Sequence, residues 1–90
     1  MNRSQAESIA LQVFQALASD EELLQRFFAL SGLSPESLRE VSRSSGFLTA
    51  ILDFVSGNER DLLELAQRQN IKPEDIMMAR SLLSPQGEFD

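Results

Sequence analysis

Apolar residues recur along this chain with the spacing of amphipathic helices, and in one stretch they are nearly continuous. Between Gly46 and Gly57 every residue is apolar except three. The exceptions, Thr49, Asp53 and Ser56, are spaced i, i+4 and i+7 and would form one narrow polar stripe on a helix. Because apolar side chains would cover the rest of the circumference, we predict a central helix that other helices contact on several sides.

Capping residues predict two helices before this stretch. Ser4 and Glu7 have the spacing of a capping box, and the apolar pattern that follows them continues to about Ala18. The same spacing recurs over Ser19–Glu22, and Gly32 is a natural left-handed end for the second helix. The residues expected to face inward are Ala6, Ile9, Ala10, Val13, Phe14, Ala16 and Leu17 in the first helix and Leu23, Leu24, Phe27, Phe28 and Leu30 in the second.

Three further helices are predicted around and after the central one. A short helix would begin with Ser34 as its N-cap and Pro35 in its first turn, and residues 42–45 would link it to the central helix. A fifth helix is expected over residues 59–69 and a sixth over residues 73–83. The inward positions of these helices and of the central one are expected to be Leu38, Val41, Phe47, Ile51, Phe54, Leu62, Leu63, Leu65, Ala66, Ile76, Met77, Ala79, Leu82 and Leu83.

The two halves of the chain align without gaps at an offset of 38 residues. This offset places Pro35 on Pro73, and it places the expected helix end at Gly32 on Asn70. A duplication into two three-helix halves explains the alignment, and so does the similarity of any two amphipathic hairpins with a proline in the first helical turn. In either case we predict one compact all-α domain of six helices over residues 1–90. Its ordered core would cover about residues 4–84, followed by a loose tail.

Composition narrows the classes of function. The chain has no cysteine and no histidine, which removes the usual nucleophile–base pairs and most transition-metal sites, so we expect no cofactor and no metal. The net charge of −6 opposes binding to nucleic acid or to an anionic membrane surface. The central stretch is too short to cross a bilayer, which takes about 20 apolar residues. No apolar signal-peptide core follows Met1, so a cytoplasmic protein is the default expectation.

Carboxylates are the remaining candidates for chemistry. Asp20, Glu21 and Glu22 form the densest acidic cluster, and they suit either a hard-cation site or the positive end of a helix; we favour the helix end. Asp53 lies inside the central helix and would need a partner such as an arginine if it were buried. We favour an exposed Asp53, because it shares the polar stripe. A small ligand-binding protein or an enzyme that uses carboxylates and arginines near Asp53 stays open as an alternative.

Two apolar residues fall off the predicted inward faces and are candidates for binding a partner. Leu11 lies away from the apolar face of the first helix, and Met78 lies away from that of the sixth. With Asp53 they are the candidate partner-binding residues, because exposed apolar side chains that cluster mark interaction sites. We therefore predict a non-enzymatic interaction or regulatory module that binds a protein partner through its helical surface. A homodimer and a monomer are equal alternatives, since self-association would cover Leu11 and Met78.

Several segments of the chain resemble a known family. They are Ala6–Ala10, Ser19–Asp20, Phe27–Leu33, and Gly46–Phe54 followed by Glu59. These residues are similar to the domain-of-unknown-function family 3572, a family of short alphaproteobacterial proteins. The resemblance covers roughly residues 6–83. It implies a bacterial, cytoplasmic and helical protein, and it carries over no activity, cofactor or site residue.

Overall fold

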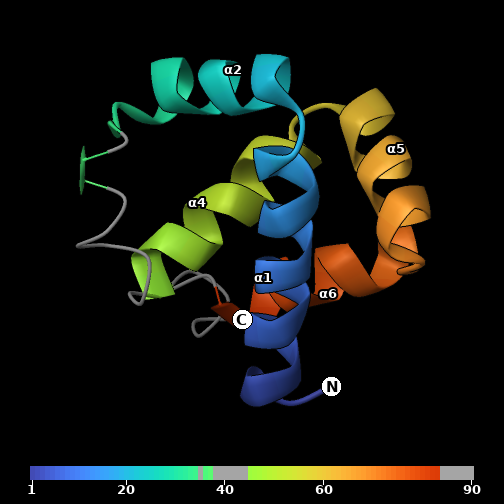
Figure 1. Ribbon diagram of the computed structural model, residues 1–90. Coiled ribbons are helices and arrows are strands. Elements are labelled where there is room, and N and C mark those ends of the chain that lie inside the picture. The colour runs from blue at the N-terminus through green and yellow to red at the C-terminus, as the bar shows by residue number, and fades with distance from the viewer. Residues whose placement is uncertain (35, 38–44, 84–90) are drawn as a thin grey trace.

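Five helices make up the regular structure of residues 1–34, 36–37 and 45–83, which are the residues that this computed structural model describes (Figure 1). The helices are α1 (Arg3–Ala18), α2 (Glu21–Ser31), α4 (Ser45–Ser56), α5 (Glu59–Gln69) and α6 (Pro73–Leu83). The described residues contain no strand, so the all-α prediction is confirmed.

The prediction of six helices is wrong for the described residues, which form five. The additional helix was expected after Ser34, where Glu36 and Ser37 are helical and residues 35 and 38–44 lie outside the described part of the chain. Leu38 and Val41, the expected inward residues, lie outside the described residues, as do the tail over 85–90 and most of the predicted linker.

The helix ends follow from local side-chain capping. α1 begins two residues earlier than predicted, because the capping box is formed by Asn2 and Gln5 rather than by Ser4 and Glu7. The Asn2 side chain accepts from the Gln5 backbone N–H at 2.8 Å, and the Gln5 side chain accepts from the Asn2 N–H at 2.9 Å. α1 ends at Ala18, as its apolar pattern predicts.

α2 and α5 have matching ends at the predicted offset of 38 residues. Asp20 and Asn58 are their N-caps, and each side-chain oxygen accepts from the backbone N–H three residues later at 3.2 Å. Gly32 and Asn70 are their C-caps, and both adopt the left-handed conformation, with φ of 76° and 55°. The left-handed ends at Gly32 and Asn70 are therefore the ones that the sequence indicates, whereas the capping-box spacing wrongly indicates Ser19 as the N-cap of α2.

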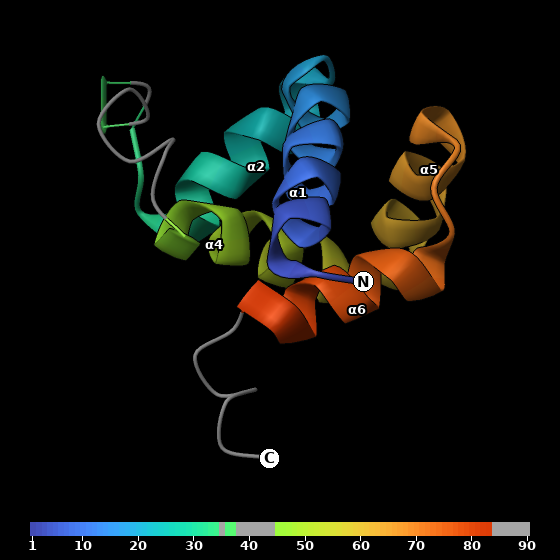
Figure 2. The ribbon, with the colours of Figure 1, turned by 90° about the horizontal axis from the view of Figure 1, so that it is seen from below.

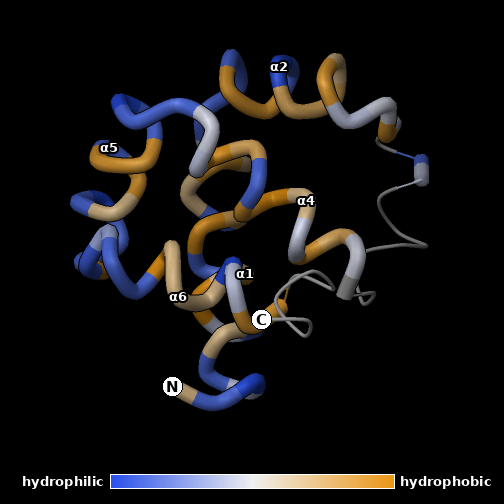
Figure 3. The backbone as a smooth tube through the Cα atoms, turned by 180° about the vertical axis from the view of Figure 1, so that it is seen from behind, coloured by the Kyte–Doolittle hydropathy of each residue, from blue (hydrophilic) through white to orange (hydrophobic). Residues whose placement is uncertain are grey.

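α4 shares the centre of the molecule with α1. Each of these two helices contacts the other, and each also contacts α2, α5 and α6 (Figure 1). In Figure 2, α1 lies between α2 and α5, and α6 runs across the lower side. α4 is hydrophobic or neutral along nearly its whole length, whereas the first turn of α1 is hydrophilic (Figure 3). The predicted central helix therefore exists, but α1 is equally central.

Aromatic contacts join three of the helices in the core. Phe47 of α4 meets Phe14 of α1 and Phe27 of α2 edge-on, with ring centroids 5.2 and 6.3 Å apart. Phe27 and Ile51 are fully buried, whereas Phe54 is only half-buried. The predicted core of the central helix is thus confirmed for Phe47 and Ile51, and Phe54 lies at its edge.

The polar stripe of α4 does not stay in solvent as one unit. Asp53 is exposed, as favoured, but Thr49 is buried and its hydroxyl donates to the carbonyl of Leu83 at 2.9 Å. The Ser56 hydroxyl oxygen is also buried, and within the described residues it has no hydrogen-bond partner. At the Thr49 end the stripe is covered because α6 packs against α4.

Four residues predicted to face inward are instead exposed: Leu30, Leu63, Met77 and Leu82. In α6 the buried positions are Ile76, Ala79 and Leu83, a narrow stripe that leaves no room for the two flanking side chains. The C-terminal turn of α2 extends away from α1 (Figure 1), and Leu30, which lies in that turn, is exposed. None of the described helices is both long and apolar enough to span a bilayer.

Candidate functional site: a cleft between α2 and α4

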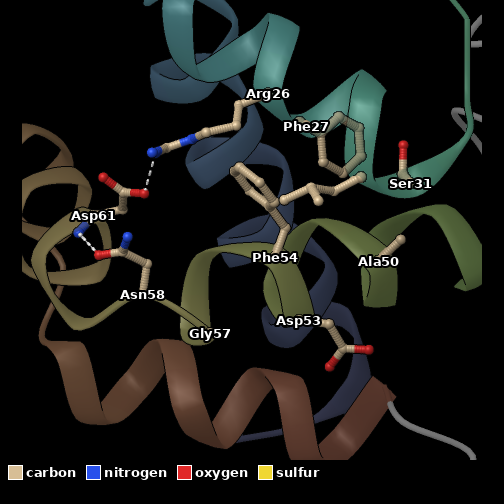
Figure 4. Close-up of a pocket in the computed structure, with 10 residues that line it drawn as sticks. Arg26, Phe27, Ser31, Ala50, Asp53, Phe54, Gly57, Asn58 and Asp61 are labelled. Atoms are coloured by element: carbon tan, nitrogen blue, oxygen red, sulfur yellow. Dashed lines mark hydrogen bonds and ion pairs between the residues drawn. The ribbon is translucent and has the colours of Figure 1, made fainter.

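An open cleft of about 540 Å³ lies between α2 and α4 and ends at the start of α5 (Figure 4). We call it the α2/α4 cleft. Its apolar wall comes from Phe27 and Leu30 on α2 and from Ala50 and Phe54 on α4. These positions are spaced i, i+3 on α2 and i, i+4 on α4, so each helix presents its pair on one face. The small side chain at Ala50 leaves space where the two helices separate.

The apolar wall combines a fixed base with a protruding side chain. The rings of Phe27 and Phe54 meet edge-on with centroids 5.4 Å apart, and Phe27 is fully buried. Leu30 is 73% exposed, the highest value among the exposed large hydrophobic residues of the described part. Figure 4 shows the two phenylalanine side chains in the space between α2 and α4. The cleft therefore offers an ordered aromatic base beside a leucine that contacts mainly solvent.

An ion pair closes the α5 end of the cleft. Arg26 Nη2 on α2 donates to Asp61 Oδ2 on α5 at 2.5 Å (Figure 4). The Arg26 guanidinium also lies over the Phe54 ring, 5.9 Å from its centroid, which is within the range of a cation–π contact. Asp61 is only 8% exposed, and it lies in the first turn of α5, where the helix dipole favours negative charge. Arg26 thus balances a buried charge and covers an aromatic ring.

A second, more polar cleft of about 310 Å³ adjoins the first on the other side of this ion pair. The two clefts share Arg26, Asn58 and Asp61 as lining residues. The second cleft is lined by four carboxylates and two guanidinium groups, a net charge of −2, and we call it the acidic cleft. Its charged residues are Asp20, Glu22, Asp61, Glu64, Arg26 and Arg60.

Arg68 balances part of this negative charge. Its Nη2 atom lies 2.6 Å from Glu64 Oε1 and 3.6 Å from Asp20 Oδ2, so it links α5 to the N-cap of α2. Glu22 is exposed, and within the described residues it has no ion-pair partner. The capping interpretation of the acidic cluster is confirmed for Asp20. In the described part of the chain, no group of three or more acidic residues is arranged to hold a metal ion.

The structure brings only one of the three candidate partner-binding residues to the cleft. Asp53 lines it, but its carboxylate points toward α6 in Figure 4 and accepts from Arg80 Nε at 2.5 Å. Both side chains of this pair are about half exposed, so we expect it to contribute little to stability. Leu11 and Met78 are 46% and 47% exposed, as predicted, but neither lines the cleft.

The residues that form the cleft carry weak signals in the sequence. Leu30 is in the last turn of α2, two residues before the C-cap Gly32. A terminal turn of this kind readily extends beyond the neighbouring helices against which the rest of the helix packs. Arg26 and Asp61 are 35 residues apart, so no local pattern pairs them. Their contact depends on the packing of α2 and α5 around α1.

Comparison with known proteins gives one match. Residues 3–86 match the model of a family described as a protein of unknown function, DUF3572. No curated protein and no solved structure matches the chain.

Proposed function

The chain belongs to the DUF3572 family, and we propose that it is a non-enzymatic interaction module that binds a protein partner in the α2/α4 cleft. The observation that carries this proposal is Leu30, which is 73% exposed beside the aromatic base formed by Phe27 and Phe54. Covering a leucine side chain yields about 1.5–3 kcal/mol, so a partner that reaches this residue gains affinity directly. The bacterial cytoplasm is the proposed setting, supported by the family resemblance.

The order of the cleft walls supports binding. Phe27 is held in the core and Phe54 lies under Arg26, so the surface is formed before a partner arrives and binding costs little rearrangement. The alternative of carboxylate and arginine chemistry near Asp53 has weaker support. The Asp53 and Arg80 side chains are each about half exposed, so water screens their charges.

A pull-down that depends on Leu30 tests the proposal. The tagged chain, a Leu30→Glu variant and a Leu63→Glu control are incubated with native bacterial lysate, and captured proteins are identified by mass spectrometry. Leu63 is a matched control because it is an exposed leucine, 49% accessible, that does not line the cleft. We expect a protein that is captured by the original chain and by Leu63→Glu and is lost with Leu30→Glu.

Equal recovery with Leu30→Glu would contradict binding in the cleft. Both substitutions place a charge at an exposed position, so the fold should persist, with changes in stability within about 0.5 kcal/mol. Circular dichroism of the three proteins checks this before the capture experiment.

A further inference from the structure

We infer that the partner segment carries a bulky apolar side chain next to a lysine or arginine, with the apolar group in the α2/α4 cleft and the cation in the acidic cleft. The inference rests on the proposed function and adds the chemistry of the partner. It follows from three properties of the paired clefts, which are their continuity, their charge and the contacts that Arg26 already makes with Asp61 and Phe54.

Continuity comes from the lining residues. Arg26, Asn58 and Asp61 belong to both clefts, so an occupant that fills the apolar one reaches the Arg26–Asp61 pair and then the carboxylates beyond it. The aromatic base and this ion pair are adjacent, because the Arg26 guanidinium lies over the Phe54 ring and also donates to Asp61. Adjacent or next-but-one residues of a partner segment can therefore enter the two clefts together.

The charge around the second cleft selects the sign of the partner. Its four carboxylates exceed its two guanidinium groups, and a net charge of −1 is left when Arg68, which pairs with Glu64 and Asp20, is counted as well. The whole chain carries −6. Glu22 is exposed and, among the described residues, not in an ion pair, so its carboxylate is open to a cation from outside. Complementary charge speeds encounter and suppresses partners of the wrong sign, which favours a basic segment.

The arginines of the cleft do not reverse this preference. Arg26 already donates to a buried carboxylate and lies over Phe54, so a partner carboxylate would have to compete with Asp61 for it. An acidic segment would also meet the net negative charge of the cleft, which is −1 with Arg68 counted. Arg60 is exposed and, among the described residues, in no ion pair, so it offsets one carboxylate, and the remaining excess of negative charge favours a basic side chain.

A peptide selection tests the inference with defined probes. A display library of random 12-residue peptides is selected on the 90-residue chain at low salt, and clones that also bind Leu30→Glu are removed. We expect the surviving peptides to combine a large apolar residue with an excess of Lys and Arg over the starting library. The strongest peptide is then synthesised for calorimetric titration.

Substitutions of matched glutamates identify the part played by charge. Glu22→Gln removes a carboxylate of the acidic cleft, whereas Glu74→Gln removes an exposed one from the first turn of α6, outside both clefts. We expect Glu22→Gln to raise the Kd of the peptide by about two- to five-fold, as loss of one exposed charge pair does, and Glu74→Gln to leave it unchanged. Added salt should also raise the Kd with the original chain.

The possible failures are distinguishable. Peptides that depend on Leu30 but show no basic excess, or whose Kd ignores Glu22→Gln, overturn this inference and leave the proposed function intact. Failure to select any peptide that depends on Leu30 overturns both.

Discussion

Phe27 and Phe54 are neighbours with different roles, and this difference can be measured. Phe27 is fully buried, so we expect Phe27→Ala to lower the free energy of unfolding by about 3–5 kcal/mol, the cost of a large cavity. Phe54 is half-buried at the edge of the cleft, so Phe54→Ala should cost less, about 1–3 kcal/mol, because part of its ring already contacts water. Urea unfolding curves of the two variants give both values.

The size of the Phe27 effect makes the comparison decisive. A domain has only about 5–15 kcal/mol of stability in total, so Phe27→Ala should be close to unfolding while Phe54→Ala stays folded. If Phe54→Ala were the more damaging change, then Phe54 would belong to the core and the α2/α4 cleft would not be open in solution.

The ends of α2 are set by single residues, and Gly32 is the clearest case. Its φ of 76° lies in the left-handed region, where any other side chain is strained, although a Cβ there would meet no atom within 4 Å. We expect Gly32→Ala to destabilise the protein by about 1 kcal/mol from backbone strain alone. Gly57→Ala is the control, because Gly57 has no left-handed φ and its Cβ would make ordinary contacts with the Asp53 and Phe54 carbonyl oxygens, at 3.4 and 3.6 Å.

Thermal melts of the two glycine variants provide the measurement. The melting temperature should fall for Gly32→Ala and change by less for Gly57→Ala. Equal shifts would mean that the left-handed end of α2 is not maintained in solution.

Helix ends were predictable because their causes lie within a few residues of the sequence. Gly32 and Asn70 end their helices as expected, whereas the N-cap of α2 is Asp20 and not Ser19, the residue that the capping-box spacing indicates. The cleft was not predictable, since it depends on how far one helix extends past another. Periodicity placed Leu30 on the inner side of α2, but it could not show that the last turn of α2 extends beyond the part that packs against α1.

At the scale of the whole molecule, self-association stays a prediction. Leu11 and Met78 are each about half exposed, on α1 and α6, and a second copy of the chain would remove them from water. If a homodimer forms there, light scattering at high micromolar concentration should give a mass above the 10.1 kDa of one chain. The paired substitutions Leu11→Gln and Met78→Gln should then restore the monomer mass, and Leu63→Gln should not. A strict monomer for the original chain would remove the dimer.

The exposed leucine over a base of phenylalanines has an optical consequence. The chain contains no tryptophan and no tyrosine, so it has almost no ultraviolet emission of its own above that of phenylalanine. A Leu30→Trp variant would keep an apolar side chain at the mouth of the cleft and would contain a single indole. This indole would replace a leucine side chain that is 73% exposed. Its emission would move to shorter wavelength whenever another molecule covers it. Occupation of this one surface could therefore be measured as a blue shift of the fluorescence emission maximum during titration with any tryptophan-free ligand.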